Sequence, residues 1–181
     1  GSFNANVIRS VRRKVETLTA AGITPHLLFV GRKGAEALRR IPVPQETVFS
    51  DLLHRLTSEQ VTPLVEFLAR GYLRGDYDRV VVVFNRFRST MVQEIAETQI
   101  FPMLENIFAP QEIPHDEAHR ELMFEPNAAA IADYLVPHFA ATELYHDLME
   151  SVAAELAARM NAMEAATKNA LEMIEKMTVI Y

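Results

Sequence analysis

The last third of the chain constrains the fold most, because residues after Pro126 run to Tyr181 without a glycine and only Pro137 interrupts a helical pattern. At 1.5 Å per residue, a helix from His138 to Tyr181 is about 65 Å long, whereas a compact globule of this chain length has a radius of gyration of about 16 Å. Such a helix is expected to project. Its apolar positions recur every three or four residues, as in a coiled coil. We call this set the apolar seam: Tyr145, Met149, Val152, Leu156, Met160, Met163, Thr167, Ala170, Ile174, Met177 and Tyr181.

A helix buried in an ordinary bundle core is the alternative to a projecting coiled coil. Helix length and sustained periodicity favour the coiled coil, whose second helix would lie outside this chain or in another chain. Small and flexible side chains suit a narrow seam, as in AARMNAMEAATKNA, Ala157 to Ala170. Burial of Met160 and Met163 against the rest of the chain would make this interpretation wrong. The surface away from the seam is polar and carries Glu155, Arg159, Asn161, Glu164, Lys168, Asn169, Glu172 and Lys176.

The first part of the chain alternates between helical and strand patterns. Apolar residues recur at helical spacing from Phe3 to Ala20, and Gly22 is a typical helix stop. The segment ITPHLLFVG, Ile23 to Gly31, predicts a buried strand that turns into the helix of KGAEALRR. A second strand is predicted near Glu46 to Phe49.

The middle of the chain contains the clearest strand, DRVVVVF, Asp78 to Phe84. Four consecutive valines predict burial on both faces, and therefore helices on both sides of a mostly parallel sheet. The preceding helix is expected to begin at Ser58, or at Thr62 with Pro63 in the first helical position. Met91 to Phe101 has the mixed pattern of an edge strand. These patterns predict an α/β fold.

Composition excludes several functions. The 18 basic and 24 acidic residues give a formal net charge of -6, which argues against nucleic acid or an anionic membrane as the main partner. Without cysteine, the chain has neither a disulfide framework nor a thiolate metal site. Its apolar runs fall far short of the roughly 20 residues that a membrane-spanning helix needs.

Three short motifs suggest chemistry, and each has a simpler explanation. DEAH, Asp116 to His119, matches a helicase box in spelling, but the chain has no phosphate-binding loop. His115 and His119 have the spacing of two metal ligands on a helix, yet they follow a proline in a predicted loop and lack a third ligand. GRKG, Gly31 to Gly34, lies between a strand and a helix, where a nucleotide phosphate could bind, although a tight turn explains both glycines. We therefore expect no catalytic, cofactor-binding or metal-binding residue.

Several segments together resemble the gamma subunit of F-type ATP synthases. AARMNAMEAATKNA is similar to the signature of that family's C-terminal helix. GSFNANVIR, FVGRKG, FNRFRSTMVQE and LMFEP resemble, in the same order, its other characteristic segments. The resemblance extends over essentially the whole chain. It implies a Rossmann-like central domain, residues 1–125, followed by a long helix, residues 126–181, that is half of an antiparallel coiled coil.

The resemblance implies a non-catalytic rotor subunit that couples proton flow through the membrane ring to ATP synthesis. The implied partners are the alpha and beta subunits of the catalytic ring, the epsilon subunit, the membrane ring and the N-terminal helix of the same subunit. Arg159, Met160 and Met163 would contact the beta subunits, with Arg159 on the other side of the helix from the seam. Contacts with the membrane ring and the epsilon subunit would come from Leu122, Met123, Phe124 and Glu125.

The resemblance further implies a location at the cytoplasmic face of a bacterial inner membrane, reached only through the complex. We expect the chain to be a fragment that lacks the N-terminal helix and the C-terminal tip of the subunit. Two functions from other classes stay open on the residues alone: a small α/β nucleotide-binding module that uses GRKG, and a coiled-coil adaptor. Tight, saturable nucleotide binding by the chain would favour the first.

Overall fold

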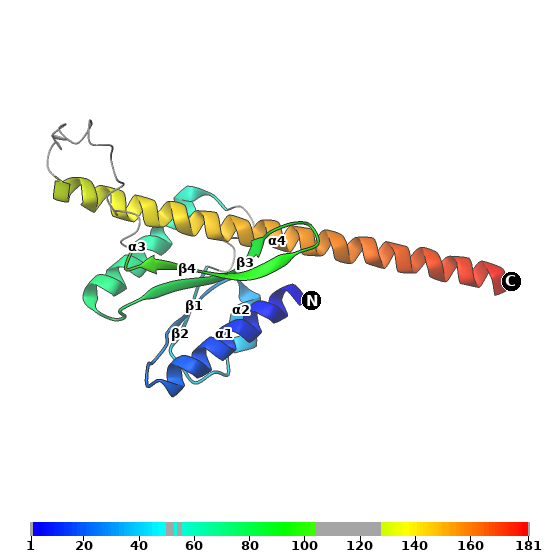
Figure 1. Cartoon of the computed structure of the whole chain (residues 1–181), viewed down its shortest axis with the longest axis horizontal. Helices are drawn as coiled ribbons and strands as arrows, with labels where there is room; N and C mark the ends of the chain where they lie inside the picture. The colour runs from blue at the N-terminus through cyan, green and yellow to red at the C-terminus, as the bar shows by residue number, and fades with distance from the viewer. Residues whose placement is uncertain (1, 50–52, 54–55, 104–127, 181) are drawn as a thin grey trace, which may run out of the picture. The chain divides into compact units, whose positions relative to one another are not determined.

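The structure is a computed structural model that describes residues 2–49, 53, 56–103 and 128–180 (Figure 1). The described residues belong to two compact units. The first comprises residues 1–55, 83–96 and 147–181, and the second comprises residues 56–82 and 97–146. Helices and strands in the order αβαβαββα confirm the α/β class and the long C-terminal helix. The predicted boundary between residues 125 and 126 stays a prediction, because the C-terminal helix contributes residues to both units.

The first unit begins with α1 (Ser2–Ala20), the helix expected at Phe3 to Ala20. Its apolar side faces inward, and Val15 is buried. The helix ends at Gly22, whose φ of 77° lies in the left-handed region that glycine adopts without a Cβ clash. The N–H of Ile23 then donates to the Leu18 carbonyl at 3.0 Å. The expected helix stop is confirmed.

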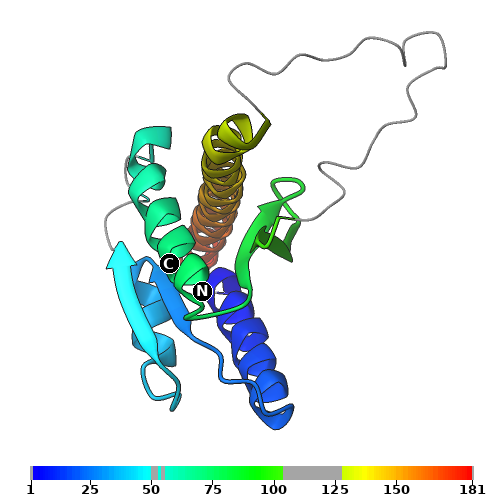
Figure 2. The same cartoon turned by 90° about the vertical axis from the view of Figure 1, so that its left-hand side faces the viewer.

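A βαβ unit follows, formed by β1 (Leu27–Val30), α2 (Arg32–Leu38) and β2 (Gln45–Phe49). The two strands pair in parallel. Figure 2 shows them side by side, with α2 against one face of the pair. The apolar side chains of Phe29 and Leu38 are buried. Both expected strands are confirmed, and the structure shows that they pair with each other in parallel.

The second unit contains α3 (Ser58–Arg74). Its first turn is closed by a capping box, in which the Thr57 N–H donates to the Gln60 side-chain oxygen at 3.3 Å. The helix ends at Gly75, whose φ is 78°. The start at Ser58 is therefore confirmed, whereas the alternative start with Pro63 in the first position is wrong. Four apolar side chains at helical spacing anchor the buried face: Val61, Leu64, Val65 and Leu68.

Strands β3 (Val80–Phe87) and β4 (Gln93–Phe101) form a separate two-stranded sheet. A tight turn joins them, in which the N–H groups of Arg88 and Ser89 both donate to the Val92 carbonyl. The expected edge strand is confirmed as β4. The predicted two-sided burial of the four valines is wrong, because all four are half-buried and the first fully buried residue of the strand is Phe84. A strand with a single neighbour cannot occupy the centre of a parallel sheet.

The C-terminal helix α4 (Ala128–Ile180) is continuous over 53 residues and passes through Pro137. An ideal helix of this length measures about 80 Å. No helix in the described part of the chain combines the length and apolar character needed to cross a membrane.

Candidate functional site

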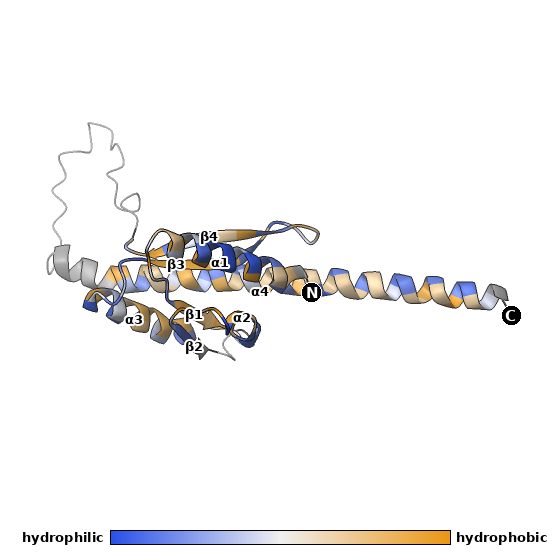
Figure 3. Ribbon diagram, turned by 90° about the horizontal axis from the view of Figure 1, so that it is seen from below, coloured by the Kyte–Doolittle hydropathy of each residue, from blue (hydrophilic) through white to orange (hydrophobic). Residues whose placement is uncertain are grey.

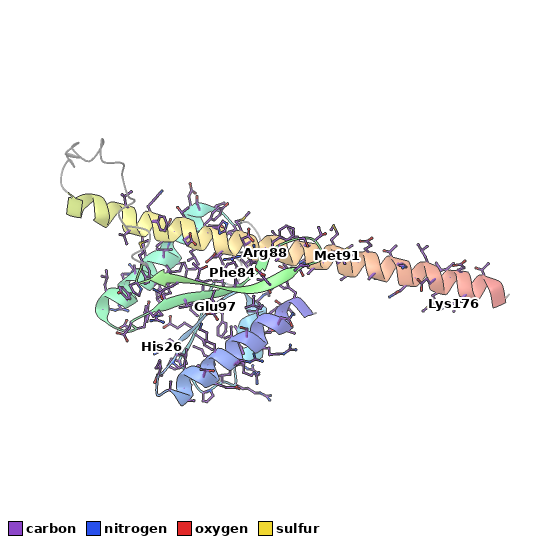
Figure 4. The ribbon with its side chains drawn as sticks, viewed as in Figure 1. His26, Phe84, Arg88, Met91, Glu97 and Lys176 are labelled. Atoms are coloured by element: carbon purple, nitrogen blue, oxygen red, sulfur yellow. The ribbon has the colours of Figure 1, made fainter. Side chains whose placement is uncertain are left out.

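Within the first unit, α4 has a contact face that packs against the β3–β4 hairpin. The contact face consists of Asp147, Ala154 and Ala157, which are all buried, and the half-buried Asn161. Ala154 is 0% exposed, so the helix backbone lies close against its neighbours. Figure 4 labels Arg88 and Met91 near the turn of the hairpin, where the hairpin lies beside α4.

Two hydrogen bonds join this part of α4 to the hairpin. The backbone N–H of Phe87 in β3 donates to Oε2 of Glu150 at 2.9 Å. Nδ2 of Asn161 donates to the carbonyl oxygen of Thr90 in the turn. The two side chains are eleven residues apart, which is about three helical turns, so they lie on one side of the helix. Together they fix the helix to the hairpin at two points along its length.

The apolar seam lies on the opposite side of α4 from the contact face, since each residue advances about 100° around a helix. Its large side chains are exposed in the chain: Leu156 is 55% exposed, Met160 51% and Met163 65%. Further along, Ile174 is 61% exposed and Met177 62%. An exposed apolar stripe of this length on a helix marks an interaction surface. The prediction that Met160 and Met163 are not buried against the rest of the chain is confirmed.

The contact face ends at Asn161, and the sequence changes there. Along the same side of the helix, the alanines give way to Lys168, Glu172 and Lys176, which are all exposed. Lys176 is labelled near the end of the helix in Figure 4. The seam, in contrast, stays apolar on both sides of Asn161. On the side of the contact face, α4 is therefore apolar only over the stretch that the chain itself covers. On the side of the seam, α4 is apolar over a stretch that the chain leaves exposed.

Arg159 flanks the seam. Its guanidinium forms an ion pair with Glu155, one turn earlier on the helix, and the two side chains are 61% and 43% exposed. Because Met163 is four residues after Arg159, the two lie about 40° apart around the helix. The expectation that Arg159 lies across the helix from the seam is therefore wrong, since that side is the contact face. An exposed pair of this kind contributes at most about 1 kcal/mol and is readily exchanged for another partner.

The other predicted site residues lie outside the described residues. These are Leu122, Met123, Phe124 and Glu125, together with the DEAH segment and both histidines of the weighed metal pair, His115 and His119. Among the residues that are described, no group of three or more acidic or histidine side chains could hold a metal ion.

The GRKG turn has a structural explanation for its first glycine. Gly31 has a φ of 106°, which side chains with a Cβ rarely adopt. A Cβ at Gly34 would lie 3.4 Å from Cδ1 of Phe29, an ordinary van der Waals distance, so the packing does not require glycine there. The helix that follows has only seven residues. The turn therefore accounts for Gly31 without a bound phosphate.

Sequence reasoning missed the hairpin turn as a contact of α4. The segment FNRFRSTMVQE contains the turn, but nothing in its sequence indicates where the turn would dock. A signal was present in α4, where polar Glu150 and Asn161 interrupt a side rich in small residues. Such polar positions on an otherwise small and apolar side predict hydrogen-bond partners, because buried polar groups are costly without them.

The geometry of α4 agrees with what comparison with known proteins finds. The family described as ATP synthase matches residues 1–181, the whole chain. The chain belongs to this family. Similar curated proteins are ATP synthase gamma chains of bacteria, among them those of Geobacter sp. (strain M21), 38% identical, and of Chlorobaculum tepidum, 33% identical. Each alignment covers 100% of this chain and 61% of the relative, so the chain spans about three fifths of an ATP synthase gamma chain.

Solved structures show the same fold. A chain in the cryo-EM structure of the central stalk and c-ring of the Tetrahymena thermophila mitochondrial ATP synthase has a TM-score of 0.68, with 24% identity over 92% of this chain and 70% of that chain. A rotor chain of the Euglena gracilis mitochondrial ATP synthase has a TM-score of 0.59, with 17% identity over 93% of this chain and 65% of that chain. At these identities the likeness shows the fold alone. The expected resemblance to the gamma subunit family is thus confirmed.

Proposed function

We propose that this chain is the central part of a non-catalytic rotor subunit of an F-type proton-translocating ATP synthase. In this role it makes and breaks no covalent bond. Rotation driven by proton flow through the membrane ring would carry α4 past the catalytic subunits and change their nucleotide affinity in turn, as a coupling of binding free energies between distant sites. Membership of the ATP synthase family supports the proposal.

The observation that carries the proposal is the exposed apolar seam of α4. A seam that stays apolar from Met149 to Met177, while the opposite side becomes charged beyond Asn161, requires a partner along its whole length. We assign that partner to the N-terminal helix of the full-length gamma chain, which would run antiparallel to α4. Two supercoiled helices resist bending and twisting better than one, as a rotating shaft needs.

The contact face would transmit torque between the shaft and the folded domain. The buried alanines bring the helix close to the hairpin, and Glu150 and Asn161 fix it at two points three turns apart. A helix held at a single point could pivot about that point. Two separated points oppose both pivoting and rotation of the helix about its own axis.

The proposed partners beyond the subunit are the alpha and beta subunits, the epsilon subunit and the membrane ring. Arg159, Met160 and Met163 would pass the beta subunits, where the cation can pair with successive carboxylates because its present pair with Glu155 is exposed and weak. Leu122, Met123, Phe124 and Glu125 would contact the membrane ring and the epsilon subunit. The complex would hold the chain at the cytoplasmic face of a bacterial inner membrane.

The test uses the full-length gamma chain assembled into its complex, with Leu156→Glu and Ile174→Glu in the seam. Each variant places a charge in a seam that the proposal buries against the second helix, so assembly and ATP-driven proton pumping should be lost. Asn169→Glu is the matched control, because it adds the same charge at an exposed polar position of the same helix. Normal assembly and pumping with both seam variants would refute the proposal. A nucleotide-binding module, the alternative function, predicts saturable ATP or ADP binding by the chain alone.

A further inference from the structure

The first 40 residues have a charge opposite to that of the rest of the chain. They hold eight of the 18 basic residues and two of the 24 acidic residues, for a net charge of +6. The remaining ten basic and 22 acidic residues give the rest of the chain a net charge of -12. The basic residues lie on or directly after two helices of the first unit, α1 and α2. The overall charge of -6 hides this local concentration.

The cationic side chains of these helices are exposed. Arg9, Arg12 and Arg13 of α1 are exposed, and so are Arg32 and Lys33 at the start of α2. Figure 3 shows α1 as a largely hydrophilic ribbon. Some exposed arginines elsewhere in the chain have carboxylate partners, as in the pair of Arg74 with Asp76 and that of Arg88 with Glu94. With the described residues, the three arginines of α1 form no ion pair.

A shallow groove of about 470 Å³ lies between the two helices. Ala5, Ile8 and Ala37 give it an apolar floor, and the side chains of Asn4, Lys33 and Glu36 complete its lining. Arg9 is one helical turn after Ala5, and Arg12 is one turn after Ile8. The two guanidinium groups therefore continue the α1 wall of the groove, opposite the Lys33 ammonium on the α2 side.

We propose that this groove binds an acidic, partly apolar segment of another protein. Arginine forks match carboxylates in two-point hydrogen bonds, and the apolar floor accommodates a small aliphatic side chain between them. Glu36 repels any anion at its own position, so the carboxylates of the peptide would lie against Arg9, Arg12 and Lys33, while Glu36 accepts a hydrogen bond from a peptide N–H. This surface is separate from the seam of α4, and its binding does not depend on the proposed rotor role.

Two other polyanions fit the groove less well than an acidic peptide. Membrane binding by an amphipathic helix needs an exposed apolar face, but the apolar side of α1 faces inward and Val15 is buried. Nucleic acid brings phosphates against Glu36, and binding to single strands uses exposed aromatic stacking platforms. The aromatic residue of α1, Phe3, is half-buried.

The experiment measures binding of the whole chain to a fluorescein-labelled helical peptide with glutamates on one side and leucines on the other. Fluorescence anisotropy gives the dissociation constant in low-salt and in physiological-salt buffer. Saturable binding that weakens with salt is expected, because exposed charges are screened. Absence of binding in low salt would overturn the proposal, and so would equal or tighter binding of heparin or phosphatidylserine vesicles.

Charge-reversal variants locate the site. The combination Arg9→Glu, Arg12→Glu and Lys33→Glu should weaken peptide binding at least about tenfold, since three weak exposed pairs turn repulsive together. The matched control is Arg70→Glu, Arg79→Glu and Lys168→Glu, which changes the net charge equally at exposed positions outside α1 and α2. An equal loss of peptide affinity in the control variant would show that only the net charge matters, and this result would refute the site.

Ala37→Phe tests the groove separately from its charge. The substituted residue is exposed in α2, so the ring fills the groove without changing the charge or the core. It should weaken peptide binding severalfold while leaving the helical circular dichroism signal unchanged. Undiminished binding by this variant would refute the groove as the binding site, even if charge reversal abolishes binding.

Discussion

Gly71 provides the sharpest test of the packing of α3. It lies inside the helix, where replacing glycine by alanine normally stabilises a protein by about 1 kcal/mol. Here a Cβ would lie 2.3 Å from Oη of Tyr77 and 2.5 Å from its Cζ. Both distances are shorter than 3.0 Å, a separation below which a Cβ essentially never approaches another heavy atom. Tyr77 must therefore move away if Gly71→Ala is to fold.

The cost of that movement follows from the contacts of Tyr77. Its hydroxyl donates to the Leu68 carbonyl at 2.7 Å, a hydrogen bond that contributes about 1 kcal/mol. Displacing the half-buried ring also exposes apolar surface, and overpacking in general costs about 1–3 kcal/mol. These costs exceed the helical gain. Gly71→Ala should therefore destabilise α3 by about 1–2 kcal/mol.

A double-mutant cycle isolates the clash. In a Tyr77→Ala background the obstructing ring is gone, so Gly71→Ala should stabilise the helix by about 1 kcal/mol. Amide hydrogen exchange of α3 is the measurement, because it reports the opening of this helix without assuming that the whole chain unfolds in one step. If Gly71→Ala stabilises α3 equally with and without Tyr77, the reasoning is refuted.

Substitutions at four further positions test other parts of the fold by urea denaturation. Thr57→Ala removes the capping box and should lower the stability of α3 by about 1 kcal/mol, whereas Thr57→Ser should retain most of it. Ala154→Leu overpacks the contact face of α4 and should lower the free energy of unfolding by about 1–3 kcal/mol. Leu156→Ala shortens a side chain of the exposed seam and should lower it by less than about 0.5 kcal/mol. A larger loss for Leu156→Ala would contradict the assignment of the two sides. Arg159→Ala should change stability by less than about 1 kcal/mol, because its ion pair is exposed, and a larger loss would show a structural role.

The helices of this chain were predictable because their signals are local. The stop at Gly22 and the start at Ser58 depend on residues within one turn of the helix end. The length of α4 follows from the absence of glycine in a periodic segment. Each of these features requires no knowledge of which distant segment lies nearby.

Strand pairing was not predictable in the same way. Four valines in a row indicate an apolar strand, but the number of strands beside it depends on segments far away in sequence. Among the residues that the structure describes, β3 pairs with β4 alone, and its valines are half-buried. The strand β3 therefore has the apolar composition of a central strand, although it belongs to a two-stranded sheet.

The candidate site was half predictable. The seam of α4 is evident in the sequence because its spacing is regular over many turns. The contact face is not evident in the sequence, because alanine is a good helix former that occurs both at solvent-exposed positions and in close helix contacts. The sequence predicts only that Asn161 lies on the polar surface away from the seam, and the structure adds that it donates a hydrogen bond to the hairpin turn.

The central claim is that α4 is the shaft of a rotor, and a covalent link between rotor and stator tests it most directly. These 181 residues contain no cysteine, so Arg159→Cys gives a unique attachment point among them for a photoreactive, cleavable crosslinker, with any cysteine in the rest of the full-length gamma chain replaced by serine. The full-length gamma chain would carry it in the assembled complex. The account predicts that illumination links position 159 to a beta subunit and stops ATP-driven proton pumping. Cleavage of the linker should then restore pumping. A complex that pumps at an undiminished rate while fully crosslinked to a beta subunit would contradict it.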